Sequence, residues 1–328
     1  MDFSLERKER LIAQFTLIKS IRNFFETQGF IDVMTPPVVE NPGMETHIHP
    51  FEVYHANNSK TTNHFLQTSP EFAMKELLAL GFEDIFNISY CFRDEPKAPH
   101  HRFQFLMLEW YRQNAHYTSI MDDVDNLFKY CVEKLQQNDI HIRNAYKNFS
   151  PQRVTVNDLF LDLLNFNLLN HLDKNDLKKY IELNHKDVPL PVKGEELSFD
   201  DYFFLLFLNK IEPQLKEIPY LLVSEFPHQL AALSTLKPTD PRVAERFEVY
   251  CYGVELCNAF NELTNLDEQI KRFNFQANEK KSLYGYSLPR PQKFYQTMEH
   301  GLPKSAGIAL GIERLLLILT NSENPFWD

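Results

Sequence analysis

Near the C-terminus, a run of small residues leads into an apolar helix with an acid–arginine pair at the junction. The run spans 307–311, the pair is Glu313 and Arg314, and the apolar residues continue to Ile318. An arginine at the point where a strand meets a helix N-terminus presents a bidentate fork of N–H donors to a phosphate. The segment therefore predicts a phosphate-binding position at Arg314, and a buried structural arginine is the ordinary alternative.

A second segment, from Arg93 to Tyr111, places polar groups on one face of a strand. Alternation along the strand sets Phe105, Glu109 and Tyr111 on one side and leaves three apolar side chains for the opposite, core-facing side. A carboxylate on such a face needs a cation as its partner, so we expect an open pocket that meets one. Taken alone, Glu109 is also typical of a surface ion pair.

Acidic residues also recur in an apolar stretch nearer the C-terminus. Glu248, Glu255 and Glu262 lie in or beside predicted strands, with Asn258 between the last two. Buried carboxylates are costly unless a cation compensates them, and Mg²⁺ on ATP phosphates prefers such oxygen ligands. In a straight strand Glu255 faces away from Asn258 and Glu262, so a bulge or bend, near Gly253, has to reconcile them. Solvated acids on an edge strand are the alternative.

Periodicity and helix-terminus signals predict the elements that position these residues. Helices are expected over 11–25, 69–80, 117–135, 202–211 and 266–281, and strands over 30–34, 85–93, 103–112, 219–226, 243–252 and 254–263. Ser69 is expected to be the N-cap of the second helix, with Pro70 at its first position. Several consecutive strands between helices predict an α+β fold with a mostly antiparallel sheet, in a single catalytic domain over 1–328.

Composition narrows the class of protein. The 328 residues are 43% apolar and 24% charged, enough for a full core. No apolar run reaches about 18 residues, so no membrane span is expected, and the charged N-terminus does not look like a signal peptide. Four cysteines without a CxxC pair predict buried free thiols and a cytoplasmic location. A net charge of −11 weakly disfavours tRNA as an obligate partner.

Read together, these segments resemble a known family. The run from Arg93 to Tyr111, with Met-Leu-Glu-Trp-Tyr at its end, is similar to motif 2 of the lysyl subgroup of class II aminoacyl-tRNA synthetases. The segment that ends in Glu313 and Arg314 resembles motif 3, and 30–37 resembles the weaker motif 1. The resemblance runs over essentially the whole chain and implies the catalytic fold of that family. It also implies a homodimer through the motif 1 region.

The resemblance implies roles in ATP binding for four residues. Arg93 would hold the α-phosphate and the substrate carboxylate, and Arg314 would stack on adenine and reach the γ-phosphate of a bent ATP. These two arginines would be the catalytic residues, because they neutralise charge in the transition state. Glu95 would read the adenine amino group, and Phe105 would stack on the adenine ring.

The other residues that match the family pattern correspond to contacts with the amino acid or with the metal ion. Those matched to the amino acid, besides Arg93, are Glu71, Glu109, Tyr111, Asn258, Glu262 and Ala309, and those matched to Mg²⁺ on ATP are Glu248 and Glu255. In this family Glu109 and Tyr111 would bind the side-chain ammonium of the substrate, and Glu71 would bind the second ammonium.

Two details resemble one branch of the family. Only about ten residues precede the motif 1 helix, so no N-terminal anticodon-binding OB domain is expected. That architecture is similar to stand-alone paralogues of lysyl-tRNA synthetase that attach a lysine-type amino acid to a lysine of translation elongation factor P. Ala309 stands where lysyl-tRNA synthetases have glycine, a change that accompanies preference for (R)-β-lysine over α-lysine. The implied reaction is ATP-dependent formation of an aminoacyl-adenylate, then transfer to elongation factor P without stable tRNA binding.

Some residues depart from the family pattern, and other functions stay open. Phe103 and Gln104 replace the usual Pro-Glu of motif 2, Glu313 replaces an aspartate, and the loop 96–101 is rich in proline and histidine. The open alternatives are activation of α-lysine for tRNA, a ligase that joins free substrates, and a non-catalytic regulator that binds lysine. Three acids matched to a dicationic substrate disfavour the second, and the metal acids disfavour the third.

Overall fold

The computed structural model describes residues 5–96, 98, 101–148, 150–190, 197–320 and 325. They form two compact units. The first unit combines Met1–Lys147 with Glu262–Asp328, and the second is the continuous segment Asn148–Asn261. The single catalytic domain over 1–328 stays a prediction.

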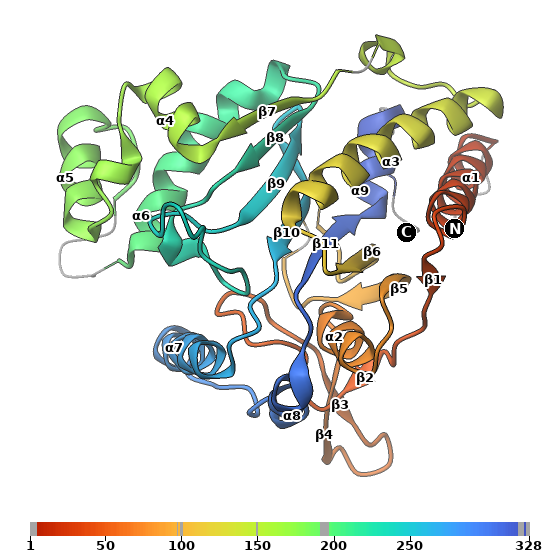
Figure 1. Cartoon of the computed structure of the whole chain (residues 1–328), viewed down its shortest axis with the longest axis horizontal. Helices are drawn as coiled ribbons and strands as arrows, with labels where there is room; N and C mark the ends of the chain where they lie inside the picture. Colours follow the sequence, from red (N-terminus) through yellow and green to blue (C-terminus); the bar gives the residue numbers. More distant parts are fainter. Residues whose placement is uncertain are drawn as a thin grey trace. The chain divides into compact units, whose positions relative to one another are not determined.

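A sheet with the strand order β1-β5-β6-β11 forms the centre of the first unit (Figure 1). Its strands are Ile31–Asp32, Asp84–Phe92, Gln104–Gln113 and Ser305–Gly311. The edge strand β1 runs parallel to β5, and the other pairs are antiparallel. A second, smaller sheet has the order β2-β4-β3, with the strands Val38–Val39, Thr61–Leu66 and Glu52–Tyr54. The long β5–β6 hairpin is the one that the sequence predicts.

Aromatic side chains make several of the contacts of the helices in this unit. They are α1 (Leu5–Glu26), α2 (Glu71–Ala79), α3 (Tyr117–Gln137), α7 (Leu266–Tyr284), α8 (Gln292–Gly301) and α9 (Ile312–Thr320). Phe25 of α1 lies 5.1 Å from Trp110 and 5.0 Å from Phe86, measured between ring centroids, on the core-facing side of the sheet. Helices α2 and α8 lie side by side (Figure 1), with Phe72 stacked on Phe294 at 4.3 Å.

The second unit has its own strands and its own phenylalanine-rich core. The strand order is β10-β9-β8-β7, with the bounds Val254–Asn261, Arg246–Cys251, Leu221–Ser224 and Gln152–Thr155. Its helices are α4 (Val156–Leu164), α5 (Lys174–Asn184) and α6 (Phe199–Leu206), followed by short helical turns at Phe207–Ile211 and Glu212–Glu217. Phe203 stacks on Phe160 at 5.5 Å and on Phe207 at 5.6 Å. All of these rings belong to one buried cluster.

Most predicted elements are confirmed, and the α+β class with a mostly antiparallel sheet is correct. The four cysteines are free and buried, as predicted. Within the described ranges, no helix is long and apolar enough to cross a membrane. The sequence patterns did not predict β7, α4, α8 or the small sheet, whose segments are all short. Lys97, Pro99 and His100 of the unusual loop lie outside the described residues.

One predicted helix cap is wrong. The N-cap of α2 is Pro70, and no side chain caps it. The Ser69 hydroxyl accepts a hydrogen bond from the Glu71 backbone N–H at 3.1 Å and donates to the Glu109 carboxylate. Ser69 therefore ties the start of α2 to β6, a contact that local sequence does not reveal.

Candidate active site

The pairing of β6 with β11 brings two predicted segments together in the first unit. Ala309 is the cross-strand partner of Glu109, and Gly307 is the partner of Tyr111. Partners in an antiparallel pair share a face, and residues two apart along a strand share it as well. These four residues therefore form one patch of the sheet surface. Ala309 is half-buried on that patch, as a residue of the pocket wall should be.

Glu109 is buried beneath two hydroxyl groups. Only 1% of the residue is exposed. Ser69 Oγ donates to Glu109 Oε1, and Tyr111 Oη donates to Glu109 Oε2 at 3.1 Å. Burial raises the pKa of Glu109 to about 8, and the nearby Glu71 carboxylate raises it further in the same direction. The face is not open at Glu109 in this structure, contrary to expectation. Glu109 holds a proton more tightly than an exposed carboxyl group does, and a bound ammonium group would take the place of that proton.

The cation expected near these acids is a lysine of the chain itself. Lys75 Nζ lies 2.6 Å from Glu71 Oε1 and 2.6 Å from Glu262 Oε2, and the lysine side chain is fully buried. Burial raises the pKa of Glu262 to about 7, although Lys75 opposes the shift. For Lys75, burial works against the charged form, but Glu262 and Glu71 outweigh it and raise its pKa. Lys75 therefore stays protonated between the two acids.

Gly307 has no side chain at the point where the Tyr111 ring and the Glu262 carboxylate come close to β11. A Cβ at this position would lie 2.3 Å from Tyr111 Cε1 and 2.7 Å from Glu262 Oε1. Real Cβ atoms do not approach other atoms so closely, and the Tyr111 ring is not free to move because it is buried in the sheet face. Gly307 thus lets the phenol and the Glu262 carboxylate lie directly over the β11 backbone.

The residues matched to ATP also lie in the first unit. The Arg93 guanidinium lies 5.2 Å from the centroid of the Phe105 ring. Arg93 Nε is buried and has no hydrogen-bond partner among the described residues. A hydrogen bond from His101 at 3.2 Å lowers the pKa of Glu95, and the charges of Arg93 and Arg314 lower it further. Glu95 is therefore within electrostatic reach of both Arg93 and Arg314, and Arg93 lies against the Phe105 ring.

Glu313 connects the helix junction to β6. Its two carboxylate oxygens both accept from the Leu106 backbone N–H, at 2.9 Å each. Burial raises the pKa of Glu313 to about 7, against the effect of the Leu106 hydrogen bond. The acid of the acid–arginine pair thus fixes the strand beside Phe105, while Arg314 is half-buried at the start of α9.

Three of the predicted residues lie in the second unit. Glu248 is buried, with Oε1 held by Arg246 Nη2 at 2.5 Å and Oε2 held by Tyr250 Oη at 2.5 Å. Arg246 Nε also donates to Asn258 Oδ1 at 3.1 Å. Burial raises the pKa of Glu248, Arg246 lowers it, and the charge of Glu255 raises it again. Arg246 therefore orients one predicted metal ligand and one predicted substrate contact.

A bulge resolves the strand geometry that the sequence leaves open. Glu255 pairs with Tyr250 and Asn258 pairs with Glu248, and the register shifts between Glu255 and Cys257. Because Tyr250 and Glu248 are two residues apart, they share a face, so their partners Glu255 and Asn258 share it too. The expected bulge is confirmed. Gly253 instead forms the hairpin turn with Tyr252, and both residues have positive φ.

Comparison with known proteins decides the family. The family model for class II tRNA synthetases (D, K and N) matches residues 3–324. The chain belongs to this family.

Several relatives of this chain share one name. Proteins named elongation factor P–(R)-β-lysine ligase include that of Hamiltonella defensa, which is 34% identical over 96% of this chain and 92% of its own length. The Vibrio cholerae protein of the same name is 34% identical over 94% of this chain and 90% of its own length. The Vibrio parahaemolyticus protein is 35% identical over 94% of this chain and 91% of its own length.

Several residues that shape this site are not among the motif residues from which the site was predicted. The most important are Ser69, Lys75 and Arg246. Lys75 follows Glu71 by four residues on a helix, a spacing that favours an ion pair, but only the structure shows that the pair is buried and extends to Glu262. Ser69 and Arg246 give no comparable signal in the sequence.

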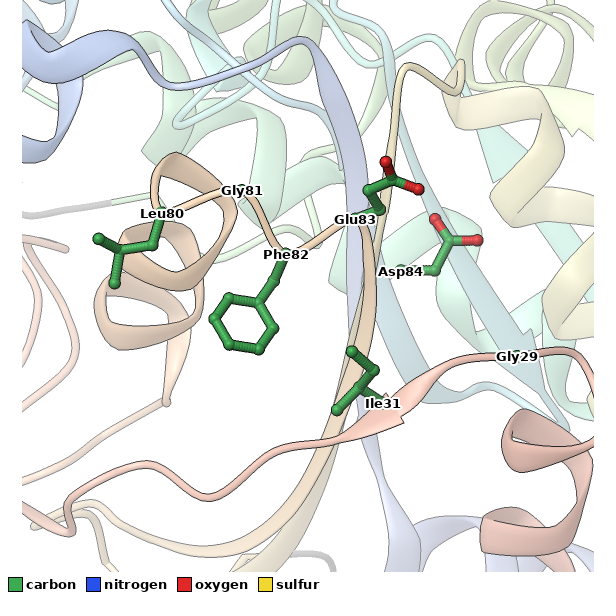
Figure 2. A pocket seen from close by; sticks show the side chains of 7 residues that line it. All are labelled: Gly29, Ile31, Leu80, Gly81, Phe82, Glu83 and Asp84. Carbon is green, nitrogen blue, oxygen red and sulfur yellow. The ribbon is translucent and has the colours of Figure 1, made fainter.

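A pocket outside these predicted residues also lies in the first unit. Its lining comes from Gly29 and Ile31 near β1 and from residues 80–84 between α2 and β5, and its volume is about 430 Å³. Figure 2 shows the Leu80 and Phe82 side chains projecting from the turn after α2, with Ile31 projecting from β1. None of the predicted site residues lines this pocket.

The buried acids predict a pH-dependent stability of the free protein. The pKa values of about 8 for Glu109 and about 7 for Glu262 and Glu313 lie above the ordinary 4.5. A folded state that holds protons more tightly than the unfolded chain is stabilised fully below the ordinary pKa and loses that stabilisation as pH rises through the folded-state pKa. We expect the melting temperature to fall by several degrees between about pH 6 and about pH 9.

Thermal unfolding followed by circular dichroism measures this slope. Glu109→Gln removes the acid with the highest of these pKa values, so the melting temperature of this variant should depend less on pH. Glu40→Gln, at an exposed ion pair with Lys293, should leave the pH dependence unchanged. A melting temperature that rises over this range would contradict the assignment.

Proposed function

We propose that the protein is an ATP-dependent ligase that activates (R)-β-lysine and transfers it to a lysine ε-amine of translation elongation factor P. One observation carries the proposal: Glu109, Tyr111 and Glu262 form a buried acidic patch in a chain whose relatives carry the name of that ligase. Acids at this depth need a cationic ligand to be ionised without large cost. A substrate with two ammonium groups supplies it.

The residues of the first unit support the activation step. Arg93 would bind the substrate carboxylate and the α-phosphate, and its unpartnered Nε leaves a donor available. Phe105, on which the Arg93 guanidinium lies, would stack on adenine. The amino-acid carboxylate then attacks the α-phosphorus, pyrophosphate leaves, and Arg93 with Arg314 neutralises the charge that grows on the phosphates. Catalysis is mainly positioning and charge neutralisation, without a covalent enzyme intermediate.

The second step transfers the activated group. The ε-amine of the acceptor lysine attacks the carbonyl of the aminoacyl-adenylate, the C–O bond to AMP breaks, and AMP leaves with the electron pair. The attacking nitrogen loses a proton and an amide forms. The acceptor amine has to arrive neutral, so transfer should be faster at mildly alkaline pH.

We assign Mg²⁺ to Glu248 and Glu255. Mg²⁺ binds through one or two carboxylates and substrate phosphates, so two acids on one face of the paired strands β9 and β10 fit it. Bound there, the ion would neutralise phosphate charge during activation. Arg246 would keep Glu248 in place until the metal binds.

Ala309 supports the choice of (R)-β-lysine. Its methyl group lies opposite Glu109 on the pocket face and narrows the space that a glycine would leave. An amino acid whose amino group is one carbon further along would fit better than α-lysine. Activation of α-lysine for tRNA is disfavoured by the net charge of −11 and by the names of the relatives, so we expect no stable tRNA binding.

ATP–pyrophosphate exchange with a panel of amino acids tests the proposal. We expect exchange with (R)-β-lysine to exceed exchange with α-lysine by at least about tenfold, a difference of about 1.4 kcal/mol in transition-state binding. Mass spectrometry should then show addition of the residue to purified elongation factor P and none to a variant with the acceptor lysine replaced by arginine. Exchange with α-lysine only, or efficient charging of tRNA, would overturn the proposal.

We also propose a homodimer that forms through the motif 1 region and works in the cytoplasm. β1 is the edge strand of the first unit, and Ile31, Met34 and Val38 around it are 48%, 94% and 44% exposed. The pocket of Figure 2 lies beside the same edge, where Ile31 of β1 is part of its lining. An apolar edge of this kind is normally covered by a partner. Sedimentation equilibrium that gives the mass of a single chain would contradict the dimer. The four free cysteines suit a reducing compartment.

A further inference from the structure

Helix α2 carries a lysine to which the proposed function gives no task. Lys75 has no exposed side-chain surface. Its ammonium lies between Glu71 and Glu262, two of the three acids matched to substrate contacts, and 5.8 Å from the centroid of the Phe294 ring. A buried ion triad adds little net stability compared with apolar residues of similar size. Its presence at this place therefore calls for a role in ligand binding.

Lys75 forms an ion pair with only one carboxylate oxygen of each acid. Its Nζ contacts Glu262 Oε2, whereas Glu262 Oε1 lies over Gly307, 2.7 Å from the place that a Cβ would take there. The oxygen that is not bound to Lys75 therefore lies beside the Tyr111 ring. Glu71 is similarly bound through Oε1, and its side chain is 14% exposed. The ion pairs turn the remaining oxygen of Glu262 toward the patch that Glu109 and Tyr111 form.

The charges of this cluster match a dication. The three acids Glu71, Glu109 and Glu262 carry three negative charges when ionised, and Lys75 supplies one positive charge. The net of two negative charges equals the charge of two substrate ammonium groups, while the substrate carboxylate is left for Arg93. Tyr111 faces the same acids and stays neutral, because burial and the Glu109 charge raise its pKa well above the ordinary value.

We propose that Lys75 is a positioning residue that keeps Glu71 and Glu262 ionised and oriented, so that the pocket accepts an amino acid with two ammonium groups. The inference rests on the proposed function. Without the lysine, two carboxylates would lie close together with no internal cation, and they would take up protons instead of binding ammonium groups. With it, the pocket is prepared for the dication before the substrate arrives.

Two variants of Lys75 test this role in the ATP–pyrophosphate exchange assay. Lys75→Gln keeps a hydrogen-bond donor and removes the charge, and Lys75→Arg keeps the charge. For Lys75→Gln we expect the KM for the amino acid to rise about 10–100-fold, while the KM for ATP changes less than about threefold. The acidic limb of the kcat/KM profile should move to higher pH. Lys75→Arg should restore the profile, and Lys293→Gln, at an exposed ion pair with Glu40, should match the unmodified protein.

Calorimetry on the unmodified protein tests the role of Lys75 without relying on variants that could fail to fold. Titration of the diamino acid at about pH 8, in two buffers of different ionisation enthalpy, should show release of less than about one proton, because Glu262, with a pKa of about 7, is already largely charged at that pH. Release of more than one proton, or an unchanged KM in Lys75→Gln, would overturn the role of Lys75. If no diamino acid binds the unmodified protein at all, the proposed function fails, which is a distinguishable result.

Discussion

Replacement of Arg93 by alanine is expected to lower ATP–pyrophosphate exchange by about 100- to 1,000-fold at saturating substrates, the loss typical of one preorganised donor to transition-state charge. Folding should hardly change, because Arg93 Nε has no hydrogen-bond partner among the described residues and the contact with Phe105 is a cation–π interaction at 5.2 Å. The melting temperature should therefore stay within a few degrees of the unmodified protein.

Two further arginine variants separate charge from geometry. Arg93→Lys keeps the charge but not the planar fork, so we expect an intermediate loss. Arg242→Ala removes an arginine that is half exposed and paired with Asp240, and exchange should be unchanged. Unchanged exchange in Arg93→Ala would remove Arg93 from the active site and leave the ATP assignment without its main support.

Replacement of Gly307 by alanine is expected to raise the KM for the amino acid by about 10–100-fold. The added Cβ would lie 2.3 Å from Tyr111 Cε1 and 2.7 Å from Glu262 Oε1, so one of these groups has to shift. Overpacking of this kind costs about 1–3 kcal/mol, which corresponds to a loss of that size in affinity. Steady-state exchange kinetics with the amino acid as the varied substrate measures it.

Gly311 offers a matched control on the same strand. A Cβ there would meet Arg314 Cδ at 3.5 Å, which is ordinary van der Waals contact. Any effect of Gly311→Ala should therefore appear in the KM for ATP and not in the KM for the amino acid. Equal amino-acid KM values in Gly307→Ala and the unmodified protein would mean that the Tyr111–Glu262 patch does not hold the substrate.

Several features of this site could be predicted because they depend on local sequence. Period-2 alternation correctly placed Trp110 in the core and Glu109 on the opposite face. The small residues before Glu313 correctly predicted a strand that runs into a helix at Ile312. Such patterns depend on backbone periodicity and helix-terminus chemistry, which act over a few residues.

Other features depend on pairing between distant segments. The bulge that sets Glu255 and Asn258 on one face was expected, but its position between Glu255 and Cys257 is decided by the register with β9. The Ser69 hydroxyl was predicted to cap α2, and it donates instead to Glu109, forty residues away along the chain. The Ser69 oxygen accepts from the Glu71 backbone N–H while its proton goes to the buried Glu109 carboxylate, so the two hydrogen bonds coexist, and only the second depends on a distant segment.

The sequence by itself determined the family, the α+β class and the identity of most residues that we assign to ATP and the amino acid, because residue types and spacings record these directly. Only the tertiary structure decided how the acids of the first unit are charged and oriented. Burial of Glu109, the insertion of Lys75 between Glu71 and Glu262, and the space over Gly307 arise where α2, β6 and β11 meet. Desolvation and close packing act between segments far apart in the chain, so no local pattern reveals them.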